Sequence, residues 1–246
     1  MNPVMREGLD VFFAEGHGLP VYFYLLSILA PVQFLALYLP SLDAQMWSGS
    51  GNLFKVSACT ALLLMVYFAL RVANQEYAPW RFQPLKRWFR EAGQSPAVVA
   101  KGQLGFLTLH ILCSFLLSAP FLVWAAAIAR APLASVAATL ALLVFYALCY
   151  SIWGLVALVL WERRPESRQV AIRCFLFFAA VATLLVYQPL NPLAYLLATL
   201  GGRELPPLSI AGVKWPAQTV HYGFHVILGG AGLALHRWAV TRGSKD

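Results

Sequence analysis

Histidine is the side chain with the clearest capacity for chemistry in this sequence. His221 and His225 are four residues apart and would share one face of a helix, while His110 lies in another apolar run. Because imidazole nitrogens bind haem iron and transition metals, one hypothesis is a haem or metal site. If both runs cross a membrane, however, His110 enters from the opposite side and is offset by roughly 9 Å. We therefore expect these histidines to line a pathway or to hydrogen-bond between helices. Tyr146 and Tyr150 are expected to line a pathway or to pack against a neighbouring helix.

Other patterns that usually carry catalysis are absent from the sequence. Lys101-Gly102 lacks the preceding glycine-rich run of a nucleotide-binding loop. The apolar runs contain no paired carboxylates, although proton- or sodium-coupled transport usually needs acidic groups within the membrane. The four cysteines lie in apolar surroundings and are too few for a disulfide framework. We expect no enzymatic activity and no bound cofactor in this chain.

The composition decides the class of protein. Of 246 residues, 60% are hydrophobic and only 11% are charged, and the mean hydropathy is +0.68. A soluble domain has roughly 25% charged residues. The net charge of +8 does not indicate nucleic-acid binding, because the basic residues fall between apolar runs. The sequence predicts an all-α polytopic membrane protein that forms a single transmembrane domain over residues 1–246.

Six apolar stretches are long enough to cross a bilayer, which requires roughly 20 residues in a helix. The expected spans are Val21–Leu39, Leu53–Val72, Leu104–Ile128, Leu133–Trp161, Val170–Tyr187 and Ala217–Val240. Fourteen of the 18 Lys and Arg residues fall on one side of this arrangement and four on the other. Since short cytoplasmic loops are enriched in Lys and Arg, we expect both termini in the cytoplasm.

Three segments outside the spans carry structural signals. Residues 3–16 place apolar side chains on one helical face, which predicts an interfacial helix within residues 1–18. The loop 73–102 contains an amphipathic stretch with basic side chains. Gly93 then signals a helix end, and Ser95-Pro96 signals a new helix start. A simpler interpretation of this loop is a basic anchor on anionic lipid headgroups.

The outer loop 188–216 contains five prolines and Gly201-Gly202, which favours a folded cap over the outer mouth. Its apolar piece Pro192–Leu200 spans only about 14 Å as a helix, so it predicts a re-entrant or interfacial segment.

The order of these features resembles the membrane subunit of type-2 ABC exporters, the ABC-2 permease family. The resemblance rests on the interfacial helix, on Ser95-Pro96-Ala97-Val98-Val99-Ala100-Lys101-Gly102 after the second span, on Pro120 late in the third span, and on Asn191-Pro192 before the last span. A short charged turn between the fourth and fifth spans and a basic C-terminal tail complete it.

The resemblance implies a function and several roles. A coupling helix in the cytoplasmic loop would dock on a separate ABC ATPase subunit, which would bind ATP and Mg²⁺, and two permease copies would form the pathway in a bacterial inner membrane. Asn191 and Pro192 would belong to an outer gate. The docking residues would be Leu85, Lys86, Arg87, Trp88, Phe89, Arg90 and Glu91, with Leu85 and Phe89 forming an apolar face against the ATPase.

Two other functions fit the residues. A non-transporting membrane scaffold or assembly factor would use the same basic loop to bind a different partner. A haem- or metal-binding redox subunit would use His110, His221 and His225.

Overall fold

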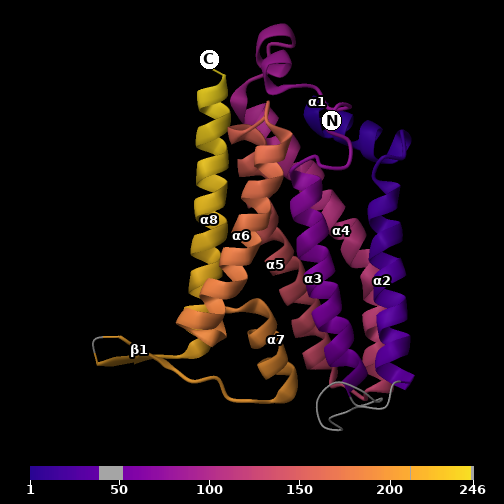
Figure 1. Cartoon of the computed structure of the whole chain (residues 1–246), viewed down its shortest axis with the longest axis vertical. Coiled ribbons are helices and arrows are strands. Elements are labelled where there is room, and N and C mark those ends of the chain that lie inside the picture. The colour runs from indigo at the N-terminus through magenta and orange to yellow at the C-terminus, as the bar shows by residue number, and fades with distance from the viewer. Residues whose placement is uncertain (39–51, 211, 245–246) are drawn as a thin grey trace.

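The structure is a computed structural model that describes residues 1–38, 52–210 and 212–244. Its long helices run side by side along one axis (Figure 1). They are α2 (Leu19–Tyr38), α3 (Leu53–Ala73), α4 (Pro96–Ile128), α5 (Leu133–Leu160), α6 (Pro165–Val186) and α8 (Ala217–Gly243). In the described part of the chain, α2 to α6 are long and apolar enough to cross a membrane. The prediction of an all-α, multi-pass membrane protein is supported at this level.

The sixth predicted span corresponds to α8, which has the required length but a more polar composition than the other five. Its 27 residues exceed the roughly 20 that a bilayer requires. Its polar side chains His221, His225 and His236 are fully buried, whereas Val226 and Ile227 are exposed. The three histidines of α8 therefore face the bundle, and Val226 and Ile227 lie on its outer face.

Both described ends of the chain lie at the same end of the bundle, together with the α3–α4 loop (Figure 1). We call this the basic end, because the termini, this loop, the α5–α6 turn and the adjoining helix ends carry the fourteen cations. These are Arg6, Arg71, Arg81, Lys86, Arg87, Arg90, Lys101, Arg163, Arg164, Arg168, Arg173, Arg237, Arg242 and Lys245, the last of which lies outside the described residues. The four remaining cations, Lys55, Arg130, Arg203 and Lys214, belong to the opposite end. The predicted segregation of charge is thus present in the fold.

The short helical elements, except η4, lie where the sequence patterns predict helices. They are α1 (Pro3–Leu9), η1 (Asp10–Ala14), η3 (Arg87–Glu91), η4 (Gln188–Leu190) and α7 (Pro192–Gly201). Asn2, Ser95 and Asn191 each cap a helix through the side-chain oxygen, and each is followed by proline. Proline lacks an N–H and loses nothing at this position. The stop at Gly93, with φ of +59°, is also confirmed.

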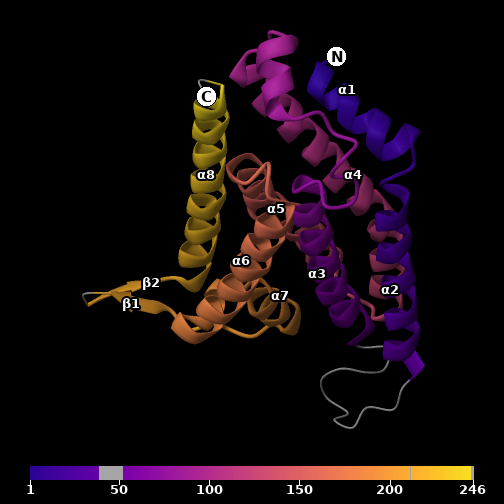
Figure 2. The ribbon, with the colours of Figure 1, turned by 45° about the horizontal axis from the view of Figure 1, so that its top comes forward.

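Helices α3 and α5 form the centre of the bundle, and a glycine allows them to approach closely. A Cβ placed on Gly154 of α5 would lie 2.5 Å from the carbonyl oxygen of Leu70 on α3. Tyr146 and Leu143, also on α5, are fully buried. Helix α6 is the least buried of the five apolar helices, and Figure 2 shows it on the outside of the bundle, near α8.

The outer segment contains one element that the sequence analysis missed. Strands β1 (Leu208–Ile210) and β2 (Val213–Trp215) form an antiparallel hairpin with Leu208 opposite Trp215. The hairpin extends away from the helices in both views (Figures 1 and 2), and the side chains of β2 are exposed. Within the outer segment, α7 contacts α3 and α5, and η4 contacts α6 and α8.

Candidate functional site

A surface helix is present where the loop 73–102 was expected to form one, but its apolar side chains are buried within the chain itself. Residues 85–91 are helical. Leu85 and Trp88 are each only 7% exposed and pack with Val4 of α1 and Val240 of α8. Phe89 is half-buried against the same cluster. The expected apolar docking face is therefore wrong for Leu85, because this side chain already has apolar partners in its own chain.

The face of this helix that solvent reaches is charged. Arg87, Arg90 and Glu91 are exposed, whereas Lys86 is half-buried. The Arg87 Nε donates to Glu91 Oε2 across 2.9 Å, so part of the charge is compensated. A partner that docked here would meet charged side chains and not an apolar ridge.

Two carboxylates accept backbone hydrogen bonds at the start of this helix and just before it, and so connect it to neighbouring elements. The N–H of Leu85 donates to Oε1 of Glu162 in the α5–α6 turn across 2.5 Å. The N–H of Gln83 donates to Oε1 of Glu7 on α1 across 2.6 Å. Burial raises the pKa of the Glu7 carboxyl to about 7, against the opposing effect of its hydrogen bonds to Gln83 and Trp88. Burial also raises the pKa of Glu162.

The N-terminal helix packs on α4. The Asn2 Nδ2 donates to the carbonyl oxygen of Val98 across 2.7 Å. A Cβ on Gly102 would lie 2.7 Å from the Val4 Cβ, so the contact is close. The face predicted to lie in lipid contained Met5, Leu9, Phe12 and Phe13, but the buried side of α1 and η1 consists of Val4, Gly8, Val11 and Phe12. The prediction of the helix is confirmed, and the predicted buried face is wrong by about one residue.

Near the opposite end, His221 joins three elements. Its Nδ1 lies 2.6 Å from the carbonyl oxygen of Pro189 in η4, and its Nε2 lies 2.5 Å from the hydroxyl oxygen of Tyr146 on α5. Since a carbonyl only accepts, the Nδ1 of a neutral imidazole carries the hydrogen, and Nε2 accepts from tyrosine. Both nitrogens of His221 are therefore occupied.

His225 repeats this pattern one turn further along α8. Its Nδ1 donates to the carbonyl oxygen of His221 across 2.8 Å, and its Nε2 accepts from the Tyr150 hydroxyl across 3.2 Å. A buried hydrogen-bonded network thus contains four of the five side chains that were expected to line a pathway, namely Tyr146, Tyr150, His221 and His225. It joins α5 to α8 and positions η4.

His110 is not part of this network. It lies on α4, where its Nδ1 is 3.1 Å from the hydroxyl oxygen of Tyr22 on α2. Its Nε2 is buried and has no hydrogen-bond partner among the described residues. The described residues also hold no group of three His, Cys, Asp or Glu side chains that could bind a metal ion. The three histidines do not form the ligand set that the redox hypothesis requires.

The buried position of His236 was not predicted from the sequence. His236 is fully buried, and its Nε2 donates to Oε1 of Gln103 on α4 across 2.8 Å. The signal was available, because His221, His225, Gly229, Gly232 and His236 follow one another at helical spacing. The inward face of α8 is this stripe, and each of its five residues is buried.

Asn191 is a joint between α6 and α7 and is only 5% exposed. Its Oδ1 accepts from the N–H of Leu193 across 3.0 Å, and its Nδ2 donates to Oγ1 of Thr183 across 3.1 Å. Pro192 occupies the first position of α7. The two residues of the predicted outer gate therefore set the direction in which the chain leaves α6.

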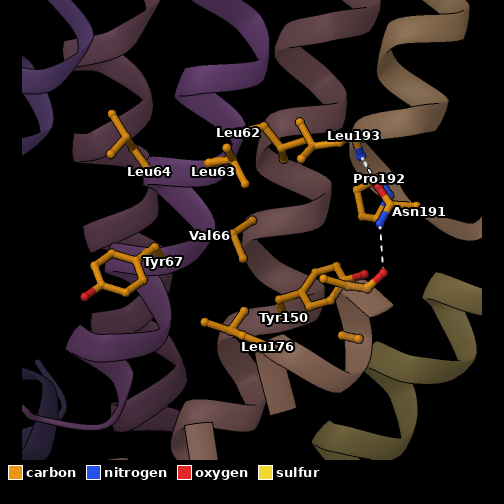
Figure 3. Close-up of a pocket in the computed structure, with 12 residues that line it drawn as sticks. Leu62, Leu63, Leu64, Val66, Tyr67, Tyr150, Leu176, Asn191, Pro192 and Leu193 are labelled. Atoms are coloured by element: carbon orange, nitrogen blue, oxygen red, sulfur yellow. Dashed lines mark hydrogen bonds between the residues drawn. The ribbon is translucent and has the colours of Figure 1, made fainter. Parts of the chain in front are cut away.

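A pocket of about 370 Å³ lies beside this joint, between α3, α5, α6 and α7 (Figure 3). Its lining is almost entirely apolar and includes Leu62, Val66 and Leu176. Tyr150 and Asn191 also line it, but their polar groups are occupied by the hydrogen bonds described above. The pocket therefore suits an apolar group and offers no site for a metal ion.

Comparison with protein-family models, with curated proteins and with solved structures gives no match for this chain.

Proposed function

We propose that this chain is the membrane-spanning permease subunit of an ATP-driven exporter whose ATPase is a separate polypeptide. The observation that carries the proposal is the attachment of the surface helix 85–91. Glu162 holds it to the α5–α6 turn, and Trp88 packs between α1, α4 and α8. A force on the exposed side of this helix would therefore move the ends of several spans together, as coupling requires.

The near absence of acidic side chains from the long helices supports the same proposal. Apart from Glu166, in the first turn of α6, no Asp or Glu lies in any of the six long helices. Transport driven by protons or sodium ions usually depends on such groups. An external ATPase removes this requirement, because the chain then needs only a pathway and a docking surface.

In this proposal all six long helices cross a bacterial inner membrane, and the basic end faces the cytoplasm. An even number of crossings agrees with the position of both described ends at one end of the bundle (Figure 1). The enrichment of Lys and Arg there agrees with the bias of cytoplasmic loops. The exposed apolar side chains of α6, among them Phe177, Phe178 and Leu185, would face lipid or a second permease copy.

The buried position of Leu85 changes the proposed docking surface. The ATPase would contact the charged side of the helix, with Arg87 and Arg90 at its centre. Charge complementarity at such a surface affects partner choice and association rate, and it weakens with added salt. Leu85 and Trp88 would transmit the movement to the spans and would not touch the partner.

Copurification tests the proposal. The tagged chain is isolated in mild detergent from cells that contain its natural partners, and the eluate is assayed for MgATP hydrolysis and for a subunit with a nucleotide-binding loop. We expect Arg87→Glu/Arg90→Glu to lose most of this subunit and its ATPase activity. The matched control Arg203→Glu/Lys214→Glu reverses two exposed cations at the opposite end and should retain both. Absence of an ATPase from the wild-type eluate, or its full retention by the Arg87/Arg90 variant, would contradict the proposal.

A further inference from the structure

Two neighbouring cavities at the basic end form one surface of mixed character. The first, which we call the basic cleft, has a volume of about 410 Å³ and lies between the surface helix, the α5–α6 turn and the end of α8. Lys86, Arg163 and Arg164 supply three cations to its lining, and Glu162 supplies one carboxylate. Arg163 and Arg164 are exposed. Among these four residues, positive charge therefore exceeds negative charge by two.

The second cavity, which we call the apolar groove, has a volume of about 200 Å³ and lies between α5, α6 and α8. Its lining includes Trp153, Ile172, Phe175 and Leu235. Trp153 and Phe175 stack with ring centroids 5.2 Å apart, which gives the groove a flat aromatic wall. Trp153, Ile172 and Phe175 lie in α5 and α6, two helices apolar enough to cross a membrane, so the groove would lie in the hydrocarbon region.

The cleft and the groove adjoin each other, because they share two lining residues. Leu160 and Trp161 belong to both. Trp161 stands at the end of α5 and is 40% exposed, as is usual for tryptophan at a membrane–water interface. Trp153 lies eight residues earlier in α5, which corresponds to about 12 Å along the helix. The surface thus passes from cationic to apolar over the depth of one bilayer leaflet.

We propose that this surface binds a phospholipid with an anionic headgroup. The headgroup phosphate would lie on Arg163, Arg164 and Lys86, and an acyl chain would lie in the apolar groove. A soluble anion would leave the groove unused, and an uncharged lipid would leave the cations unused. Basic pockets between helix ends on the cytoplasmic side are suited to such headgroups.

The carboxylate in the cleft does not remove this complementarity. Oε1 of Glu162 accepts the N–H of Leu85 and so joins the two walls of the cleft. Even with Glu162 ionised, the three cations of the cleft outnumber this single carboxylate. Arg87 and Arg90, the centre of the proposed ATPase docking surface, do not line the cleft. The lipid site therefore does not depend on the proposed transport function.

The test uses the purified full chain without any ATPase. Native mass spectrometry compares retention of phosphatidylglycerol and phosphatidylcholine with identical acyl chains. We expect the wild type to prefer phosphatidylglycerol, and glycerol 3-phosphate not to displace it. Each surface cation contributes roughly fivefold to binding of an anionic lipid. Arg163→Gln/Arg164→Gln should therefore lower the preference by roughly thirtyfold, whereas Arg130→Gln/Arg203→Gln should leave it unchanged.

A second variant tests the groove. Ala171→Phe places a ring in its lining and should reduce retention of both lipids. Ala127→Phe, on the exposed surface of α4, is the control and should retain both. Equal retention of the two lipids by the wild type would overturn the proposal. So would an unchanged preference in Arg163→Gln/Arg164→Gln, or displacement of the lipid by glycerol 3-phosphate.

Discussion

Tyr195 of α7 stacks on His221 of α8, with the ring centroids 3.7 Å apart and the planes inclined by 9°. The same imidazole donates to Pro189 and accepts from Tyr146. One side chain therefore holds α5, η4, α7 and α8 in a fixed relationship. The position of the outer segment depends on directional contacts that apolar packing alone would not supply.

Replacing Tyr146 with Phe should weaken the contacts through which His221 holds these four elements together. The change removes only the hydroxyl and leaves the Nε2 of His221 without a donor in a buried site. Hydrogen bonds between membrane helices contribute about 1 kcal/mol, and we expect a loss of that size in unfolding experiments in detergent. Cysteines introduced on α7 should also become more reactive. Tyr24→Phe, on the exposed face of α2, is the control. Equal stability of the two variants would contradict the proposed role of the Tyr146–His221 hydrogen bond.

The local signals in the sequence predicted where helices begin. Ser95-Pro96 combines an acceptor for a free N–H with a proline suited to the first turn, and it marks the start of α4 as predicted. Asn191-Pro192 combines the same two features and starts α7, although it was not interpreted as a helix start. Such signals act within four residues and need no tertiary information. The long apolar runs were equally informative, because the thickness of a bilayer sets their length.

The partner of each apolar face was not predictable in the same way. The pattern of Leu85, Trp88 and Phe89 shows that one side of a helix avoids water. It does not show whether that side contacts lipid, an ATPase or other helices of the same chain. For the same reason, the sequence did not show that α1 packs on α4. The hairpin from Leu208 to Trp215 was missed because its six paired residues are too few for a clear alternating pattern.

The crossing of α8 can be tested by labelling. In a variant that lacks the native cysteines, single cysteines are placed at positions 87, 203 and 242. If all six long helices cross, a membrane-impermeant maleimide should modify position 203 in intact cells and positions 87 and 242 only after permeabilisation. Modification of 203 and 242 from the same side would show that α8 does not cross.

The attachment of α1 to the surface helix should depend on pH through Glu7. Its pKa of about 7 in the folded state lies above the ordinary value of 4.5, so the folded state binds the proton more tightly than the unfolded state. The associated stability is complete below pH 4.5 and is lost as the pH rises through 7. Because Glu7 is only half-buried, solvent screening reduces the effect to the order of 1 kcal/mol.

Thermal unfolding at pH 5.5 and pH 8 measures this effect. The wild type should be less stable at pH 8, and Glu7→Gln should remove most of the difference, since the amide keeps an acceptor for the Gln83 N–H. Asp10→Asn, a similar change in an exposed neighbour, should retain it. An unchanged pH dependence in Glu7→Gln would show that another group is responsible.

Alanine substitutions at three glycines should change the stability by different amounts, according to how tightly the helices pack at each position. A Cβ on Gly154 would meet the carbonyl oxygen of Leu70 at 2.5 Å and the Cβ of Ala73 at 2.8 Å. Neither atom can rotate away, so Gly154→Ala must separate α3 from α5. Overpacking of this kind costs about 1–3 kcal/mol. A Cβ on Gly232 would meet the Ile152 side chain at 3.0 Å, which can adjust, and a smaller loss is expected there.

Gly230 completes the series as the control, because nothing among the described residues lies within 4 Å of an added Cβ. Alanine also favours a helix over glycine by roughly 1 kcal/mol, so Gly230→Ala should be neutral or stabilising. Unfolding of the three variants in the same detergent gives the order. If Gly154→Ala were as stable as Gly230→Ala, the α3–α5 crossing would be looser than the structure shows, and a force applied at the surface helix would not pass rigidly through these two helices.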